Sequence, residues 1–267
     1  MTALTALVGG AGRAALNQLY GVARVCVLIV DTLYWLVAAP FRGKGLRIRA
    51  AVECFVEFGY HSMPIVGLIC FLIGAIMAMQ ASYQLARFGA TQYIANLVGV
   101  AAVRELAPLM TAIILTGRSG SAIAAEIGTM KVAEEIDALD VMGVNPTKFL
   151  VVPKFLAMVA AIPCVTVLAM FIMILGGFVL STMVLSVDVG LYIENTAGAL
   201  QLKDFATGMT KSVFFAIVIC WVGVYRGFQV EGGAEGVGKM TTSSVVTSIF
   251  FIIIVDLVFS ALFYFAV

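Results

Sequence analysis

Four ionisable residues lie inside otherwise apolar stretches of the sequence, where an unpaired charge is unfavourable. They are Arg104, Glu105, Lys211 and Asp256. An isolated charge at the centre of an apolar membrane helix costs at least about 2.5–3.5 kcal/mol, so each side chain needs a partner or a ligand. The planar guanidinium of Arg104 suits bidentate contact with a phosphate, and Glu105 beside it can hold the guanidinium or help release the ligand.

Each of these charges also has a purely structural interpretation. Arg104 and Glu105 could form an internal ion pair that only holds helices together, and Lys211 could extend to the end of its helix. Asp256 has no neutralising neighbour in its own segment, so we expect it to pair across helices with Lys211 or Arg104. Pro108 lies four residues after Arg104 and lacks the N–H that would bond to its carbonyl, which predicts a distorted helix there.

Other motifs do not support catalysis or metal binding. Gly233–Lys239 reads GAEGVGK, but Met240 stands where a phosphate-binding loop needs Ser or Thr, so we interpret the segment as a flexible turn. Glu134 and Glu135 are adjacent, as in some membrane-embedded proteases, yet no histidine follows them. His61 is the single histidine, and the five cysteines are far apart, as expected of small buried apolar residues. We therefore predict that the chain is not an enzyme, has no catalytic residues and binds no metal.

The composition is that of a membrane protein. The 267 residues are 62% hydrophobic and 12% charged, with a mean hydropathy of +1.09, whereas soluble domains are about 45–50% apolar and about 25% charged. A soluble fold of this size could not bury so much apolar surface, so lipid must solvate part of it. The net charge of +1 offers no basic face, which argues against nucleic acid as a partner.

The apolar stretches predict an all-α membrane protein, a single domain of residues 1–267 with five transmembrane helices. The predicted spans are residues 62–86, 93–117, 155–182, 205–225 and 245–266, each close to the ~20 residues that cross a bilayer. The stretch from Val25 to Phe41 is short for a span and contains Asp31. We expect residues 1–50 to form an interfacial or re-entrant amphipathic helix, not a cleaved signal peptide.

Basic residues near the span ends predict the orientation. They concentrate before the first span, between the second and third, and between the fourth and fifth, and the positive-inside rule places these segments in the cytoplasm. The N-terminus is then cytoplasmic and the C-terminus periplasmic. The residues are Arg42, Lys44, Arg47, Arg49, Arg118, Lys131, Lys148, Lys154, Arg226 and Lys239.

A short amphipathic helix is predicted at residues 128–146, between the second and third spans. Its apolar residues recur at helical spacing and its other faces are acidic; Gly143 and Asn145-Pro146 stop it. Helices that lie on anionic lipid usually carry Lys and Arg, so an acidic helix favours docking to a partner protein over simple attachment to the membrane. The residues predicted to dock are Val132, Glu134, Glu135, Ile136, Asp137 and Leu139.

A resemblance to a known family rests on residues 103–146, which read VRELAPLMTAIILTGRSGSAIAAEIGTMKVAEEIDALDVMGVNP. This segment closely resembles the permease family of MCE-type lipid transporters, the MlaE/YrbE family. The strings RELAP and AEIGTM are specific, whereas the apolar runs are not. The likeness extends to KSVFFAI at Lys211, to the span of Asp256 and to the N-terminal segment, and so covers nearly the whole chain.

The resemblance implies a homodimeric permease of an ABC transporter in the inner membrane of a Gram-negative bacterium. It implies that phospholipid moves between inner and outer membranes, contributing to outer-membrane lipid asymmetry. Implied partners are an ABC ATPase at the acidic loop helix, which would hold ATP and Mg²⁺, a small STAS-domain protein on that ATPase, and a periplasmic MCE-domain hexamer. No cofactor is expected in this chain. The resemblance also places in a lipid cavity Arg104, Glu105, Lys211, Asp256 and Met77.

Two other functions remain open at this stage. A gradient-driven secondary transporter would use Arg104, Glu105 and Asp256 for ion or proton coupling. A structural membrane anchor for a periplasmic lipid-binding ring would tolerate the loss of these charges. The acidic loop helix favours the ATP-coupled function over both.

Overall fold

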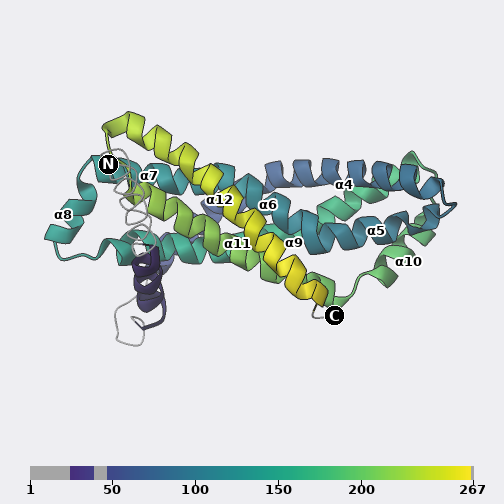
Figure 1. Ribbon diagram of the computed structural model, residues 1–267, viewed down its shortest axis with the longest axis horizontal. Coiled ribbons are helices and arrows are strands. Elements are labelled where there is room, and N and C mark those ends of the chain that lie inside the picture. Colours follow the sequence, from purple (N-terminus) through teal and green to yellow (C-terminus); the bar gives the residue numbers. More distant parts are fainter. Residues whose placement is uncertain (1–24, 39–46, 266–267) are drawn as a thin grey trace, which may run out of the picture.

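The computed structural model describes residues 25–38 and 47–265, and this part of the chain is helical, without strands. Long helices lie along one another in an elongated bundle, and α12 crosses the others diagonally (Figure 1). The helices are α3 (Ile48–Phe58), α4 (Met63–Ala86), α5 (Ile94–Ala101), α6 (Ala107–Leu115), α7 (Ser121–Val132), α8 (Glu135–Val141), α9 (Val152–Met183), α10 (Val189–Ala199), α11 (Leu202–Phe228) and α12 (Gly233–Phe265). Short 3₁₀ or π turns are η1 (Tyr34–Ala38), η2 (Tyr60–Ser62), η3 (Thr91–Tyr93), η4 (Ala102–Leu106), η5 (Thr116–Gly120) and η6 (Thr147–Val151).

The predicted fold class is confirmed, because five helical segments of the described part are long and apolar enough to cross a membrane. They are Ile48–Ala86, Thr91–Val132, Thr147–Met183, Leu202–Phe228 and Gly233–Phe263. A shorter apolar helix, Val25–Val37, precedes them, as expected for the N-terminal region. Residues 1–24 and 39–46 lie outside the described part, so the interfacial placement of residues 1–50 stays a prediction.

The second span is longer than predicted. It was expected to end near Gly117, yet the helical path continues through η5 and α7 to Val132. The reason is that the charge of Arg118 finds partners inside the protein: its Nη1 donates to the carbonyl of Glu57 at 3.0 Å and to Ser62 Oγ at 2.5 Å. Since these bonds tie Arg118 to the turn between α3 and α4, the charge does not end the helix.

The helix α9 lies against α4 through close backbone contact. A Cβ on Gly74 would stand 1.9 Å from the carbonyl oxygen of Met173, and a Cβ on Gly176 would stand 2.1 Å from that of Phe71. Only glycine permits this approach, which is the way small residues let membrane helices pack closely. The main hydrophobic core is built around α9, with buried residues from α6, α7 and α11.

The two ends of the bundle carry different short helices. Figure 1 shows α8 and the start of α12 at one end and α10 at the other. The sequence did not predict α10; the carboxylate of Asp188 caps it by accepting the N–H of Leu191 at 3.0 Å. The loops predicted to be cytoplasmic lie at the α8 end. Which end faces the cytoplasm stays a prediction.

Candidate functional site

The pair Arg104–Glu105 lies in η4, a single π-helical turn within the second span. The N–H of Ala107 bonds to the carbonyl of Ala102 there, five residues back, and Pro108 next to it has no N–H to offer. Single π turns inside α-helices often mark functional sites. The distortion predicted from Pro108 is therefore present, and it sets the two charged side chains off from the regular helical positions.

The turn η4 meets α11 at Gly208. A Cβ at this position would stand 2.2 Å from the carbonyl oxygen of Val103, so the close approach of the two helices requires glycine. Gly208 lies between Asp204 and Lys211 along α11, about one turn from each. Both side chains are thereby brought to the charged residues of η4.

Arg104 pairs with Asp204, not with its neighbour Glu105. Its Nε donates to Oδ1 of Asp204, while Oδ2 of the same carboxylate accepts the N–H of Gln201 at 2.9 Å and so caps α11. The Asp204 side chain is 2% exposed, whereas that of Arg104 is 45% exposed. The terminal nitrogens of Arg104 have no partner among the described residues, so they are open to a ligand.

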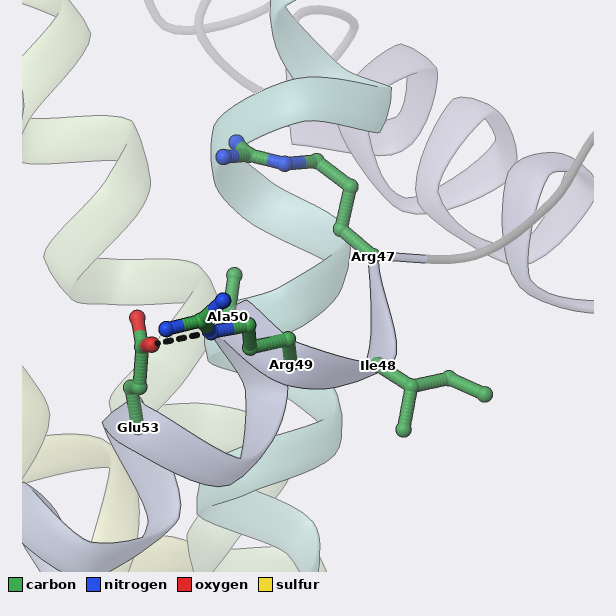
Figure 2. A pocket seen from close by; sticks show the side chains of 5 residues that line it. All are labelled: Arg47, Ile48, Arg49, Ala50 and Glu53. Atoms are coloured by element: carbon green, nitrogen blue, oxygen red, sulfur yellow. Dashed lines mark hydrogen bonds and ion pairs between the residues drawn. The ribbon is translucent and has the colours of Figure 1, made fainter.

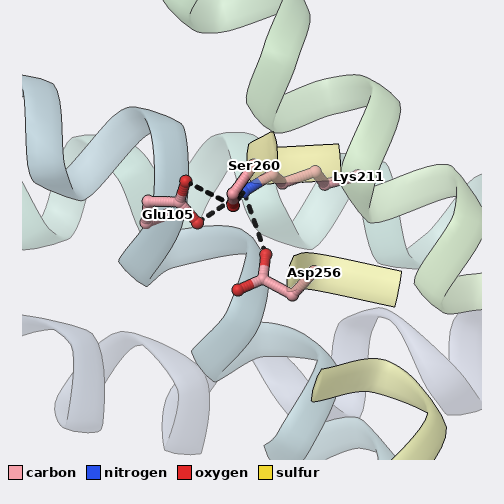
Figure 3. Close-up of polar contacts among 4 residues, drawn as sticks. All are labelled: Glu105, Lys211, Asp256 and Ser260. Carbon is pink, nitrogen blue, oxygen red and sulfur yellow. Dashed lines mark hydrogen bonds and ion pairs between the residues drawn. The ribbon is translucent and has the colours of Figure 1, made fainter. Parts of the chain in front are cut away.

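Lys211 holds the second half of the site together, as Figure 3 shows. Its Nζ contacts Oε2 of Glu105 at 2.5 Å, the hydroxyl of Ser260 at 2.8 Å and Oδ1 of Asp256 at 3.0 Å. Ser260 in turn donates to Oε1 of Glu105 at 3.0 Å. The ammonium thus donates hydrogen bonds to Glu105 and Ser260 and forms a second ion pair with Asp256. We call the six residues Arg104, Glu105, Asp204, Lys211, Asp256 and Ser260 the ionic cluster.

The ionic cluster is enclosed on one side and open on the other. The Lys211 side chain is 0% exposed, which excludes the interpretation that it extends to the end of its helix. Glu105 is 40% exposed and Asp256 18%. A ligand therefore meets the two carboxylates and Arg104, while the ammonium that balances part of their charge lies behind them.

Sequence reasoning predicted some of these pairings and missed others. The pairing of Asp256 with Lys211 across helices is confirmed, and the internal pair of Arg104 with Glu105 is not formed. Asp204 was missed, although the spacing Gln201-x-x-Asp204 marks a helix start at which a carboxylate caps the backbone. Ser260 carries no such signal.

Met77 lies apart from the ionic cluster. It packs against a small separate core formed by α4 and α5, whose buried residues are Ala78, Ala81, Ile94 and Val98. A role of Met77 in a lipid cavity stays a prediction.

The acidic loop segment forms two helices instead of the predicted one. The first, α7, ends at Val132, and Glu134 has φ 59°, in the left-handed region, before α8 begins. Ile136 and Leu139 of α8 are buried in the main core, so they do not present an apolar face to a partner. The reason is that the turn at Glu134 rotates α8 relative to α7.

The outward surface of α8 is acidic and apolar. Glu134, Glu135 and Asp137 are exposed, and Asp137 also contacts Lys131 at 3.3 Å. The exposed apolar side chains beside them are those of Val132, Val141 and Met142. This surface, with α8 anchored from behind, is the part of the segment that a partner can reach.

Two further sequence features are resolved by the structure. Gly233–Lys239 forms the first turns of α12, so the predicted flexible turn is wrong. A shallow hollow of about 530 Å³ lies at the start of α3, lined by Arg47, Ile48, Arg49, Ala50 and Glu53 (Figure 2). Its Arg49–Glu53 pair at 3.1 Å is largely exposed, and such surface pairs contribute little.

Comparison with known proteins decides the family. The family model described as Permease MlaE matches residues 51–262, which includes every residue of the ionic cluster. The chain belongs to the MlaE permease family.

Relatives of this MlaE permease support the assignment. A probable ABC transporter permease protein of Rickettsia typhi is 36% identical over 209 residues, which cover 78% of this chain and 81% of the relative. One from Synechocystis is 35% identical over 206 residues, covering 77% and 78%. Protein TRIGALACTOSYLDIACYLGLYCEROL 1, chloroplastic, of Arabidopsis thaliana is 34% identical over 223 residues, covering 84% of this chain and 63% of the relative.

Family membership fixes the general role of the chain. It is a multi-pass membrane protein and the permease of an ABC transporter. A permease of this kind is a transport subunit, and it works with an ABC ATPase.

Proposed function

We propose that this MlaE-family permease moves phospholipid between the inner and outer membranes of a Gram-negative bacterium, driven by its ATPase, and so contributes to outer-membrane lipid asymmetry. The observation that carries the proposal is the open guanidinium of Arg104 within an apolar bundle. A phospholipid needs a polar contact for its phosphate and an apolar space for its acyl chains, and this arrangement supplies both. The Arabidopsis relative, named after a galactolipid, also supports a lipid as cargo.

Within this function the residues of the ionic cluster have distinct roles. Arg104 contacts the phosphate through its terminal nitrogens, held in place by Asp204 at its Nε. Glu105 and Asp256 form the polar surface beside Arg104, and the buried Lys211 contacts both of them. Met77 lines the cavity from a second copy of the chain, since the permease is a homodimer.

The ATPase docks at the outward surface of α8. Glu134, Glu135 and Asp137 supply the charge and Val132 an apolar contact, while Ile136 and Leu139 anchor α8 to the bundle and transmit its movement. ATP and Mg²⁺ belong to that ATPase. A small STAS-domain protein sits on it, and a periplasmic MCE-domain hexamer covers the opposite end, near α10. The α8 end is then cytoplasmic, as is the N-terminus, and the C-terminus is periplasmic.

Photo-crosslinking of lipid to the purified complex tests the cargo. Arg104→Ala should reduce crosslinking of a photoreactive phospholipid about tenfold or more, since a hydrogen bond to a charged group contributes about 1.5–3 kcal/mol. Arg104→Lys should lose less, because it keeps the charge without the planar fork. Arg49→Ala, at an exposed arginine of α3, is the control. Unchanged crosslinking and transport in Arg104→Ala, normalised to assembled permease, would remove the proposed site.

Charge reversal at α8 tests the coupling. Glu135→Lys with Asp137→Lys should release the ATPase while the chain still inserts, because insertion depends on the apolar spans. Glu194→Lys, an exposed acidic residue of α10, is the matched control and should retain the ATPase. Normal co-purification with the double variant would contradict docking at α8. Lipid transport that survives loss of the ATPase would instead support a gradient-driven transporter, and no transport at all would support a structural anchor.

A further inference from the structure

The open side of the ionic cluster carries an excess of negative charge. With every group ionised, Arg104 and Lys211 face three carboxylates, those of Glu105, Asp204 and Asp256, which leaves one negative charge uncompensated. No other charged residue contacts these groups in the described part of the chain. An uncompensated charge away from water is costly, so the site favours a ligand that brings a cation.

The excess lies at a definite place. The carboxylate of Asp204 is fully used, because it accepts bonds from Arg104 and from the N–H of Gln201. Asp256 contacts Lys211 through Oδ1 and also lies within hydrogen-bonding reach of the Glu105 carboxylate, so the two acidic side chains adjoin one ammonium. The single ammonium of Lys211 is shared between Glu105 and Asp256. The uncompensated negative charge therefore lies on these two carboxylates, which are the ones that a ligand can reach.

The site that can bind an anion, at Arg104, therefore lies next to the site that can bind a cation, at Glu105 and Asp256. Arg104 and Glu105 are neighbours in η4, and the first offers free guanidinium nitrogens while the second belongs to the anionic side. Phospholipid headgroups that carry an amine have the matching pattern, a phosphate joined to a cation by a short linker. Headgroups with phosphate alone match only half of it.

We propose that the site selects zwitterionic phospholipids, with the phosphate on the terminal nitrogens of Arg104 and the headgroup amine on the carboxylates of Glu105 and Asp256. This inference rests on the proposed transport of phospholipid and adds the headgroup class to it. An anionic headgroup without an amine leaves the excess charge uncompensated and adds its own negative charge to it, so it binds less well.

Competition between two lipids tests the selection. The assembled transporter is placed in bilayer nanodiscs with photoreactive phosphatidylethanolamine or phosphatidylglycerol that have identical acyl chains. The wild-type chain should crosslink the ethanolamine lipid on the order of tenfold more strongly, equivalent to about 1.4 kcal/mol. Asp256→Asn removes the excess charge and should reduce the preference to about twofold or less, whereas Asp256→Glu should keep it. The control Asp31→Asn, on the N-terminal helix, should leave it unchanged.

Each outcome has one meaning. Equal crosslinking of both lipids by the wild-type chain would overturn the headgroup selection and leave phospholipid transport standing; a proton that neutralises the excess would give this result. A preference that persists in Asp256→Asn would place the amine elsewhere and also overturn the inference. Crosslinking of neither lipid to assembled wild-type transporter would refute the proposed function itself.

Discussion

Replacement of Lys211 by methionine should destabilise the protein by about 3 kcal/mol. The ammonium is fully buried and contacts Glu105, Ser260 and Asp256 within 3.0 Å, and methionine fills similar space without charge. Removing one partner of a buried ion pair costs about 3–5 kcal/mol, since a charge is left unpaired. Because Glu105 is partly exposed and water can solvate it, we expect the lower end of this range.

The measurement is the free energy of unfolding of the full chain by denaturant titration in micelles. Lys203→Met is the matched control, as it removes an exposed lysine from the same helix, and should stay within about 0.5 kcal/mol of wild type. The double variant Lys211→Met with Asp256→Asn should recover part of the loss, because it also removes one stranded carboxylate. A loss below about 1 kcal/mol for Lys211→Met, or no recovery in the double variant, would refute the reasoning.

Three other predictions follow from the packing and the topology. Gly208→Ala should abolish stable assembly, because its Cβ would stand 2.2 Å from the carbonyl oxygen of Val103. The control Gly117→Ala, where a Cβ meets nothing within 4 Å, should be neutral or slightly stabilising. Thermal denaturation measures both effects. Cysteine at Gly238 should react with an impermeant thiol reagent only from the cytoplasm, and cysteine at Glu194 only from the periplasm. Burial raises the pKa of Tyr192 to about 12 from the usual 10, so its stabilising contribution is complete below pH 10 and declines as the pH rises towards 12; Tyr192→Phe should remove this decline.

The importance of the mid-span charged residues could be predicted from the sequence. Each stands in an apolar stretch, where a charged side chain is rare and needs a partner. The reasoning found Arg104, Glu105, Lys211 and Asp256 without any tertiary information, and it anticipated the distortion beside Pro108. Their pairing was less accessible, since it depends on which helices meet.

Asp204 and Ser260 could not be found in the same way. Asp204 lies among polar residues at the start of a span, where a carboxylate is not exceptional. A serine inside a helix usually bonds to its own backbone, so Ser260 gives no sign of a tertiary partner. Gly208 is likewise one of 26 glycines in the sequence. Only the tertiary structure shows that η4 packs so closely against it that a larger residue would not fit.

Helix ends were predicted less well than helix existence, for two physical reasons. Arg118 was taken as the end of the second span because a charge usually stays at the membrane surface, but its bonds to Glu57 and Ser62 satisfy it within the protein. The periodicity of Val132, Ile136 and Leu139 suggested one helix, but the left-handed residue Glu134 divides it. Periodicity does not detect a single residue with positive φ.

The length of the second span has a consequence for coupling. The helical path that carries Arg104 and Glu105 continues without a loop to Val132, and only the turn at Glu134 separates it from α8. The ionic cluster and the proposed ATPase surface therefore lie on one continuous helical path, which contains the two π turns η4 and η5. We expect a displacement of α8 to be transmitted along this path and to act at these two distorted turns. Glu105 and Arg104 bond to different residues of α11, Lys211 and Asp204. We therefore expect a shift of η4 to change both bonds at once, which would carry movement of the ATPase to the proposed lipid site.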